Sequence, residues 1–304
     1  MDRRTFLATT FASTALAQRG AQQPQPAAAP GTAAPAKAKI TSSVMLWTLK
    51  GTFEQRLESA LQSGIQSVEL VGEHTKWTPA DIARIKKLTR SMHLGMDTIS
   101  STPNWKQMPI SMVDPAQRAN LLQEVALNIN FAQRLEVPML LLMSGDAIAG
   151  RTYEEQYKSM VEGARRCGDL AEKAGVTLII EPLNTKVDHK GYWLSNCVEG
   201  LKIVKEVDNP HVRLLFDIYH EQVEMGEVLT TIKDAANYVK VFHVADNPGR
   251  HDPGTGTMKY DEIYKTIAKT GYAGHLTMEY VPVADPVASL QKAVTSMRAA
   301  LNVT

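Results

Sequence analysis

The segment VTLIIEPLN, residues 176–184, contains a pattern that recurs through most of the chain and predicts its architecture. A short run of apolar and β-branched residues ends in a carboxylate and a turn, as in a strand buried on both faces of a parallel sheet. The preceding segment 153–175 is amphipathic and closes on Gly175, which is typical of a helix. The same alternation continues in both directions. We expect strands at 44–48, 67–71, 94–99, 138–143, 176–181, 212–217, 238–243 and 275–279.

Eight strand and helix pairs predict one α/β domain, a single (β/α)₈ TIM barrel over residues 39–304, because such barrels contain about 250 residues. An open doubly wound sheet is the main alternative. No GxGxxG motif follows the first expected strand, which weighs against a dinucleotide-binding fold and a phosphate-binding loop. After the first 20 residues no apolar run reaches about 18 residues, so we expect no membrane span in the mature chain.

The charges and the cysteines narrow the classes of function. Lys plus Arg total 33 and Asp plus Glu total 32, a formal net charge of +1, so no overall field attracts nucleic acid or an acidic membrane surface. Two cysteines occur, Cys167 and Cys197, which excludes a disulfide scaffold and a Cys-rich zinc site. Any metal ion must therefore be bound by carboxylates and histidines.

The N-terminal segment resembles an export signal. The pair Arg3 and Arg4 is followed by a short apolar run that ends in small residues at Ala17, the order found in a twin-arginine signal peptide. We expect residues 1–17 to direct export, so that the protein is periplasmic or secreted. A disordered or helical tail is the alternative. Residues 18–38 are rich in Ala, Pro and Gln and contain no acidic or aromatic residue, which predicts a disordered linker.

Four consecutive expected strands end in a side chain that can bind a metal: Glu181, Asp217, His243 and Glu279. A carboxylate at the end of a buried strand is unfavourable unless it is paired or binds a cation. For any one of these residues alone, a helix cap or an ion-pair partner is an equal alternative. Adjacent strands lie about 4.8 Å apart, so the four side chains are expected to surround one ion at the barrel mouth. This donor set suits Mg²⁺ or Mn²⁺, with Co²⁺ or Zn²⁺ as alternatives.

The segments around these residues resemble one family. EPLN, FDIYH, FHVADNPGRHDPGTG and GYAGHLTMEY are similar to the hydroxypyruvate isomerase group of the xylose isomerase-like TIM barrels, which also include ketose 3-epimerases and an AP endonuclease branch. The resemblance implies that the four strand-end side chains hold the metal and that Glu181 and Glu279 are the catalytic acid and base. Hydroxypyruvate isomerases commonly have Gln where His243 stands, whereas the epimerase branch has His, so the exact substrate stays open.

We therefore expect an exported, metal-dependent isomerase whose partner is a small hydroxy-carbonyl or sugar substrate. Isomerisation and epimerisation both remove a proton beside a carbonyl and form an enediolate, which a divalent ion stabilises as a Lewis acid. Conversion of hydroxypyruvate to tartronate semialdehyde is the first hypothesis, and a ketose 3-epimerase or another sugar isomerase is the second. A non-catalytic sugar-binding protein is the alternative of another class. An AP endonuclease-like enzyme would need more than the eight histidines present and a basic face. A homo-oligomer is left open.

Further residues near the expected strand ends are candidates for substrate contact. They are Trp47, Glu69, Asn184, His220 and Arg250, with His189 as a further pocket residue. His220 resembles the substrate-contacting histidine of the epimerase branch, and Arg250 offers a bidentate site for a substrate carboxylate. A loop histidine and a solvent-facing arginine are equal alternatives, and for Trp47 a core position is the common one. Glu69 interrupts an apolar strand, and a structural role beside the site is favoured over a bond to a sugar hydroxyl.

Overall fold

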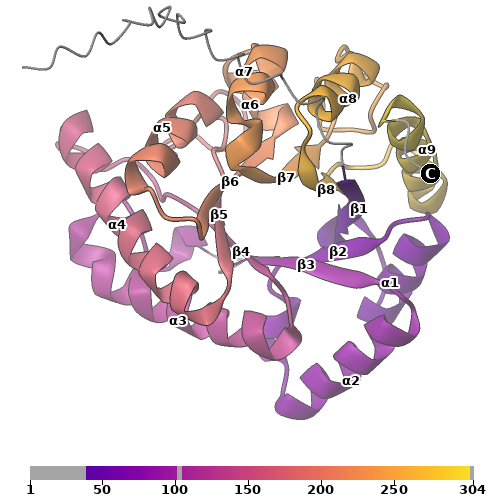
Figure 1. Ribbon diagram of the computed structural model, residues 1–304, viewed down its shortest axis with the longest axis horizontal. Coiled ribbons are helices and arrows are strands. Elements are labelled where there is room, and N and C mark those ends of the chain that lie inside the picture. Colours follow the sequence, from indigo (N-terminus) through magenta and orange to yellow (C-terminus); the bar gives the residue numbers. More distant parts are fainter. Residues whose placement is uncertain (1–38, 101–104, 302–304) are drawn as a thin grey trace, which may run out of the picture. The chain divides into compact units, whose positions relative to one another are not determined.

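Eight parallel strands close into a barrel in the order β1 to β8, with helices around it (Figure 1). The computed structural model describes residues 39–100 and 105–301, so the predicted signal and linker lie outside the described residues. The predicted (β/α)₈ barrel is confirmed. The strands are β1 (Lys39–Met45), β2 (Ser67–Leu70), β3 (Gly95–Ser100), β4 (Met139–Leu142), β5 (Thr177–Ile180), β6 (Val212–Asp217), β7 (Val239–Val244) and β8 (Ala273–Met278).

Helices connect consecutive strands, and threonines begin several of them. At the start of α1, Thr52 and Gln55 each accept a hydrogen bond from the other's backbone amide, and Thr78 and Thr152 begin α2 and α4 in the same way. None of the helices in the described part of the chain is long and apolar enough to cross a membrane. The α-helices are α1 (Phe53–Gln62), α2 (Pro79–Ser91), α3 (Arg118–Leu135), α4 (Tyr153–Ala174), α5 (Cys197–Val207), α6 (Ile218–Glu224), α7 (Val228–Ala235), α8 (Tyr260–Lys269) and α9 (Pro286–Leu301). The 3₁₀ helices are η1 (Leu46–Thr48), η2 (Glu73–Lys76), η3 (Trp105–Gln107), η4 (Pro115–Gln117) and η5 (Ala236–Tyr238).

Alternation along the strands separates two apolar clusters. In β4, Leu140 and Leu142 belong to the cluster that the strands share with the helices, whereas Leu141 belongs to a smaller cluster of strand residues. The buried members of this smaller cluster are Met45, Met139, Leu141, Ile179, Leu215 and Val241. They fill the inside of the barrel, which is therefore a packed core and not a pore.

The strand register places the predicted metal ligands at one end of the barrel. Asp217 on β6 is the register partner of His243 on β7. Glu181 and Glu279 follow the last residues of β5 and β8, and their amides donate to carbonyls of β4 and β7 at 3.2 and 3.1 Å. These bonds extend the ladder by one residue. All four side chains therefore stand at the C-terminal ends of the strands, where TIM barrels carry their active sites.

The first strand differs from the sequence-based expectation. The hydrophobic pattern indicated residues 44–48, whereas β1 begins at Lys39, ends at Met45 and is followed by η1. The polar residues at the start of β1 gave no hydrophobic signal, yet they pair in register with β8. Trp47 consequently lies on η1, in the turn at the barrel mouth, and not on the strand.

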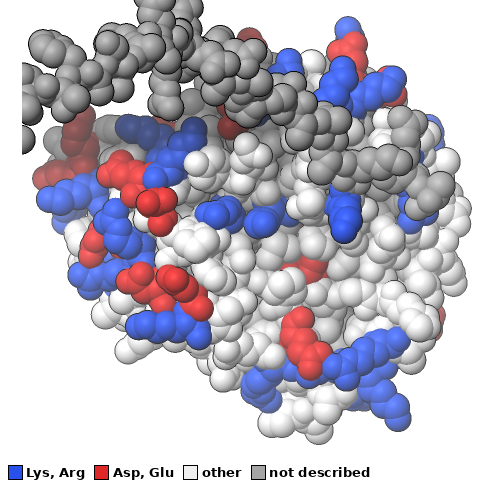
Figure 2. All heavy atoms as spheres, in the orientation of Figure 1, with Lys and Arg blue, Asp and Glu red and all other residues white. Residues whose placement is uncertain are grey.

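The surface charges are of mixed sign. On the face shown in Figure 2, Lys and Arg side chains lie interspersed with Asp and Glu. This distribution agrees with the formal net charge of +1. On that face the charges do not gather into a broad field of one sign, which is what attraction of a nucleic-acid backbone would require.

Candidate metal centre and adjoining cavity

Four buried side chains converge at the C-terminal mouth of the barrel. Glu181, Asp217, His243 and Glu279 each offer a ligand atom, and these atoms lie within 4.8 Å of one another. Nδ1 of His243 is 2.6 Å from Oε2 of Glu279, 3.4 Å from Oε1 of Glu181 and 4.0 Å from Oδ2 of Asp217. The structure thus brings together all four residues that the strand-end pattern singled out.

The charges at this mouth perturb one another strongly. Burial raises the pKa of Glu181 to about 7. Burial would lower the pKa of His243, but the carboxylates of Glu69 and Glu279 hold it well above its usual value. Burial would raise the pKa of Glu279, but the charges of Arg250 and His243 hold it well below its usual range. Such a cluster of buried acids is stabilised when a cation is added.

The donor set fits one divalent metal ion. Nδ1 of His243 lies among three buried carboxylates and contacts Oε2 of Glu279 at 2.6 Å. Buried carboxylates so close together repel one another, and a cation between the four ligand atoms would offset this repulsion. Three carboxylates and one imidazole suit a hard or borderline divalent ion.

Asp217 is a helix cap and a candidate ligand at the same time. It is the N-cap of α6, where its Oδ1 accepts from the His220 amide at 2.9 Å. Its Oδ2 remains directed toward Nδ1 of His243. Burial raises the pKa of Asp217 above its usual value. The helix cap and the metal role are therefore compatible, because each uses a different oxygen.

Glu69 lies behind His243. It is fully buried on β2, and its Oε2 is 3.1 Å from Nε2 of His243. Its Oε1 accepts from Oγ1 of Thr277 on β8 at 2.7 Å. Both carboxylate oxygens are thus used inside the barrel, and Glu69 is not among the residues that line the adjoining cavity. Glu69 therefore lies in a structural position beside the site, the role that its place in an apolar strand favoured.

A cavity of ≈170 Å³ opens beside the ligand set. Trp47 is 40% exposed and donates from Nε1 to Oε1 of Glu279 at 3.3 Å. It therefore forms part of the cavity wall and not of the core. The lining also contains apolar residues from several strands. The polar and aromatic lining residues are Trp47, Ser100, Glu181, His189, His220, Arg250 and Glu279.

The guanidinium of Arg250 faces the ligand set. Its Nη2 lies 2.8 Å from Oε1 of Glu279 and 3.3 Å from Oδ2 of Asp217. Its central carbon lies 5.4 Å from the ring centroid of Tyr219 and 6.0 Å from that of Trp47, within range of a cation–π interaction. The backbone of Arg250 has φ of 56°, a strained conformation for a residue with a side chain. The loop therefore holds this side chain in place at some conformational cost.

Two residues outside the predicted set position Arg250. Tyr219 supplies the ring beneath the guanidinium. Asp246 is fully buried, and its carboxylate accepts from three amides of the loop after β7, at 2.8, 2.7 and 3.1 Å. These bonds fold the loop that carries Arg250. The motif DNPG, in which an Asp precedes turn-forming residues, is the sequence signal that could have identified Asp246.

The remaining predicted pocket residues form a second wall. His220 is buried, and its Nε2 has no hydrogen-bond partner among the described residues. Burial and the charge of Arg250 keep the pKa of His220 well below its usual value, so the ring is neutral. Asn184 lies behind it, with Nδ2 2.6 Å from Nδ1 of His220 and 2.7 Å from Oδ2 of Asp188. Asn184 thus supports the cavity without lining it, whereas His189 is a lining residue.

Known proteins resemble this chain over most of the barrel. The family described as xylose isomerase-like TIM barrel matches residues 57–300. Hydroxypyruvate isomerase of Escherichia coli (strain K12) is 29% identical over 243 residues, covering 79% of this chain and 92% of that protein. 2-Oxo-tetronate isomerase of Cupriavidus necator is 28% identical over 176 residues, covering 58% of this chain and 67% of that protein. D-Psicose 3-epimerase of Clostridium cellulolyticum H10, solved with D-tagatose, is similar in fold, with a TM-score of 0.74 at 19% identity over 86% of this chain and 99% of that one.

Proposed function

Because the chain belongs to the xylose isomerase-like TIM barrel family and is an isomerase, we propose that it acts on small hydroxy-carbonyl compounds through an enediolate and depends on one divalent metal ion. Hydroxypyruvate, which would become tartronate semialdehyde, is the first proposed substrate. One observation carries the proposal: two buried glutamates, Glu181 and Glu279, belong to the ligand set and also line the adjoining cavity.

The two glutamates are proposed to carry the proton. One carboxylate removes it from the carbon beside the carbonyl, and the other returns a proton to the adjacent carbon. Glu181, with a pKa of about 7, can hold or release a proton near neutral pH. A bound divalent ion would supply Lewis-acid stabilisation of the substrate oxygens. The hydrogen count of substrate and product is the same, so the reaction needs no external oxidant or reductant.

Arg250 supports a substrate that carries a carboxylate. Its side chain lines the cavity, and its Nε has no hydrogen-bond partner among the described residues. A guanidinium binds a carboxylate through two parallel hydrogen bonds. The cavity of ≈170 Å³ is smaller than the about 300–1,000 Å³ of common ligand pockets, which favours a compound of few carbons. Both points favour a short hydroxy-keto acid over a hexulose.

A ketose 3-epimerase is the second candidate. His243 favours it, because the family resemblance implies Gln at this strand end for hydroxypyruvate isomerases and His for the epimerase branch. Epimerisation returns the proton to the same carbon from the opposite face, and the same two glutamates would suffice.

A substrate panel assayed by NMR in deuterated water tests the proposal. Hydroxypyruvate, trioses, pentuloses and hexuloses are each incubated with the Mg²⁺-loaded protein and with a chelator-treated control. We expect deuterium beside the carbonyl and new product with hydroxypyruvate, and neither above background in the control. Turnover of a pentulose or hexulose alone would favour the epimerase. Absence of exchange in every compound would contradict the proposed chemistry.

The metal dependence has its own test. The purified protein should contain about one divalent ion per chain, and a chelator should remove both the ion and the activity. Elemental analysis of Asp217→Ala and His243→Ala should show much weaker metal retention. Parent-like occupancy in both variants would remove the metal centre from the proposal.

We also propose that the protein is exported through the twin-arginine pathway. The support is the sequence order around Arg3 and Arg4, which lie outside the described residues. Replacing both arginines with lysine should leave full-length protein in the cytoplasm. Fractionation that finds this variant exported as well as the parent would contradict the assignment.

A further inference from the structure

The imidazole of His243 is held between carboxylates on both of its nitrogens. Nδ1 faces the ligand set, 2.6 Å from Oε2 of Glu279 and 3.4 Å from Oε1 of Glu181. Nε2 faces the other way, 3.1 Å from Oε2 of Glu69. His243 and Glu69 are both 0% exposed, so water does not compete for either contact.

This arrangement decides which nitrogen can bind a metal. A neutral imidazole has one N–H donor and one lone pair, and a metal takes the lone pair. An ionised carboxylate accepts hydrogen bonds but cannot donate one. When Nε2 donates its proton to Oε2 of Glu69, the lone pair of Nδ1 is the one directed at the three carboxylates of the candidate ligand set.

Glu69 is itself fixed by the barrel. Its Oε1 accepts from Oγ1 of Thr277 at 2.7 Å, and Thr277 is the register partner of His243 between β7 and β8. The pairing of β2 with β3 shifts register between Val68 and Glu69, and such irregularities re-aim a side chain. Because Glu69 does not line the cavity, any effect on the site must pass through His243.

We propose that Glu69 is a positioning residue of the metal centre, which fixes the tautomer and the ring orientation of His243, and that Thr277 holds Glu69 for this purpose. The inference rests on the proposed metal dependence. Outer partners of metal-binding histidines commonly change metal affinity about 10- to 100-fold when they are removed.

Two substitutions of Glu69 separate the hydrogen bond from the packing. Glu69→Met keeps a side chain of similar length but removes the acceptor, and the affinity for Co²⁺, added alone, should fall about 10- to 100-fold. Glu69→Gln can still accept from Nε2 through its amide oxygen while its amide nitrogen donates to Thr277. The glutamine variant should therefore recover most of the lost affinity.

The matched control is Asn128 on α3, which is 2% exposed and whose Oδ1 lies 3.2 Å from Nε2 of the buried His74, a histidine outside the ligand set. Asn128→Leu should leave Co²⁺ affinity within about twofold of the parent. An equal loss in Asn128→Leu and Glu69→Met would mean a general effect of removing the partner of a buried histidine and would overturn the proposal. Parent-like affinity in a folded Glu69→Met protein would overturn it as well.

Thr277→Val keeps the proposal falsifiable if Glu69→Met does not fold. It removes only the hydroxyl that holds Glu69, and Co²⁺ affinity should fall by more than about twofold, whereas an unchanged value overturns the proposal. These measurements use the metal alone. If the parent protein binds Co²⁺ but exchanges no hydrogen in any hydroxy-carbonyl compound, the proposed function is contradicted. The role of Glu69 in metal binding is then unaffected.

Discussion

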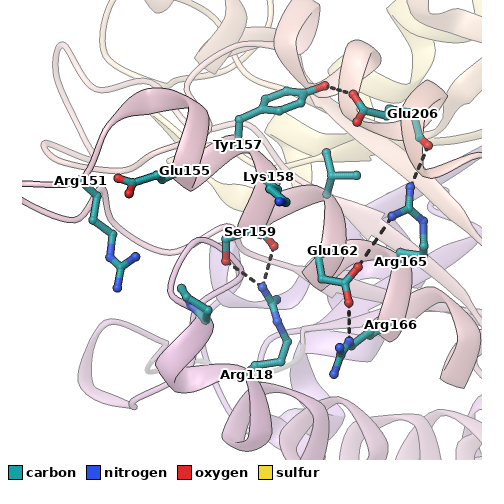
Figure 3. Close-up of a pocket in the computed structure, with 12 residues that line it drawn as sticks. Arg118, Arg151, Glu155, Tyr157, Lys158, Ser159, Glu162, Arg165, Arg166 and Glu206 are labelled. Carbon is teal, nitrogen blue, oxygen red and sulfur yellow. Dashed lines mark hydrogen bonds and ion pairs between the residues drawn. The ribbon is translucent and has the colours of Figure 1, made fainter.

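Two regions of the molecule gather charged side chains and use them differently. A groove of ≈710 Å³ lies along α4 between α3 and α5, and it is larger than the cavity at the barrel mouth. In Figure 3 its charges face one another: Glu162 contacts Arg165 and Arg166, and Tyr157 donates to Glu206. At the mouth, three buried carboxylates and one histidine face a shared space. In the larger hollow, the carboxylate of Glu162 thus already has two guanidinium partners.

The two regions differ in how exposed their charged side chains are and in where these side chains point. The ion pairs of the groove are between 44% and 55% exposed, and such pairs contribute about 0–1 kcal/mol. One buried atom there, Nη1 of Arg118, lacks a hydrogen-bond partner, but it lies against the backbone of Gly163. At the mouth Nδ1 of His243 and Oε2 of Glu279 contact each other and share one buried space with Glu181 and Asp217. The burial and convergence of these side chains, and not cavity size, single out the mouth as the candidate site.

The sharpest test of this comparison replaces one glutamate at a time. Glu181→Gln and Glu279→Gln keep the shape and one acceptor oxygen but cannot take a proton, so isomerisation should fall about 10²- to 10⁴-fold. Glu162→Gln in the groove is the matched control and should leave turnover unchanged. The assay is NMR in deuterated water with the metal-loaded protein. Turnover within a fewfold of the parent in both active-site variants would place the proton carriers elsewhere.

The contrast between these regions also shows what a sequence can predict. The four candidate metal ligands end apolar runs on four strands, so a local pattern and the rule that parallel strands end at one edge were sufficient to group them. The partner of His243 could not be found in this way. Glu69 is 174 residues away in the chain, and its contact depends on which way two side chains point inside the closed barrel.

The positions of residues in loops were harder to predict from the sequence. Asn184 was expected to line the pocket, but the turn after β5 places it behind His220. Trp47 was assigned to the end of a strand, but the chain turns into η1 before it. The local turn signal of DNPG marks Asp246, but two of the amides that it binds lie 8 and 12 residues further along the chain, which that signal does not reveal. Such positions depend on turn geometry and not on hydrophobic period.

A change of packing in the groove should lower the stability of the protein but leave metal binding at the mouth unchanged. A Cβ on Gly163 would lie 1.8 Å from Nη1 of Arg118, whose Nη2 is held by the carbonyls of Met112 at 3.0 Å and Ser159 at 2.6 Å. Gly163→Ala must therefore displace the guanidinium, and the free energy of unfolding should fall by about 1–3 kcal/mol. Denaturant unfolding of the metal-free protein measures this loss.

The control for Gly163→Ala is Lys158→Ala, an exposed position on the same helix, which should change stability by no more than about 0.5 kcal/mol. Both variants should bind Co²⁺ like the parent. An unchanged free energy of unfolding in Gly163→Ala would mean that Arg118 does not tie α3 to α4. A loss of Co²⁺ affinity in that variant would show that the two regions are coupled.

A further expected effect is a pH dependence that the mouth has and the groove lacks. Without metal, Glu181 has a pKa of about 7 and the pKa of His243 is raised, so both hold protons as the pH falls below 7. A metal must displace these protons, and each one displaced lowers affinity about tenfold per pH unit. In the groove, the hydrogen bond from Arg166 lowers the pKa of Glu162, which stays ionised throughout. Competition titrations with Co²⁺ between pH 8 and 6 should therefore show affinity falling toward low pH, with proton release on binding, in the parent and in Glu162→Gln alike. A flat profile would mean that the four side chains hold no protons over this pH range. The charges at the mouth would then perturb pKa values no more than those in the groove do.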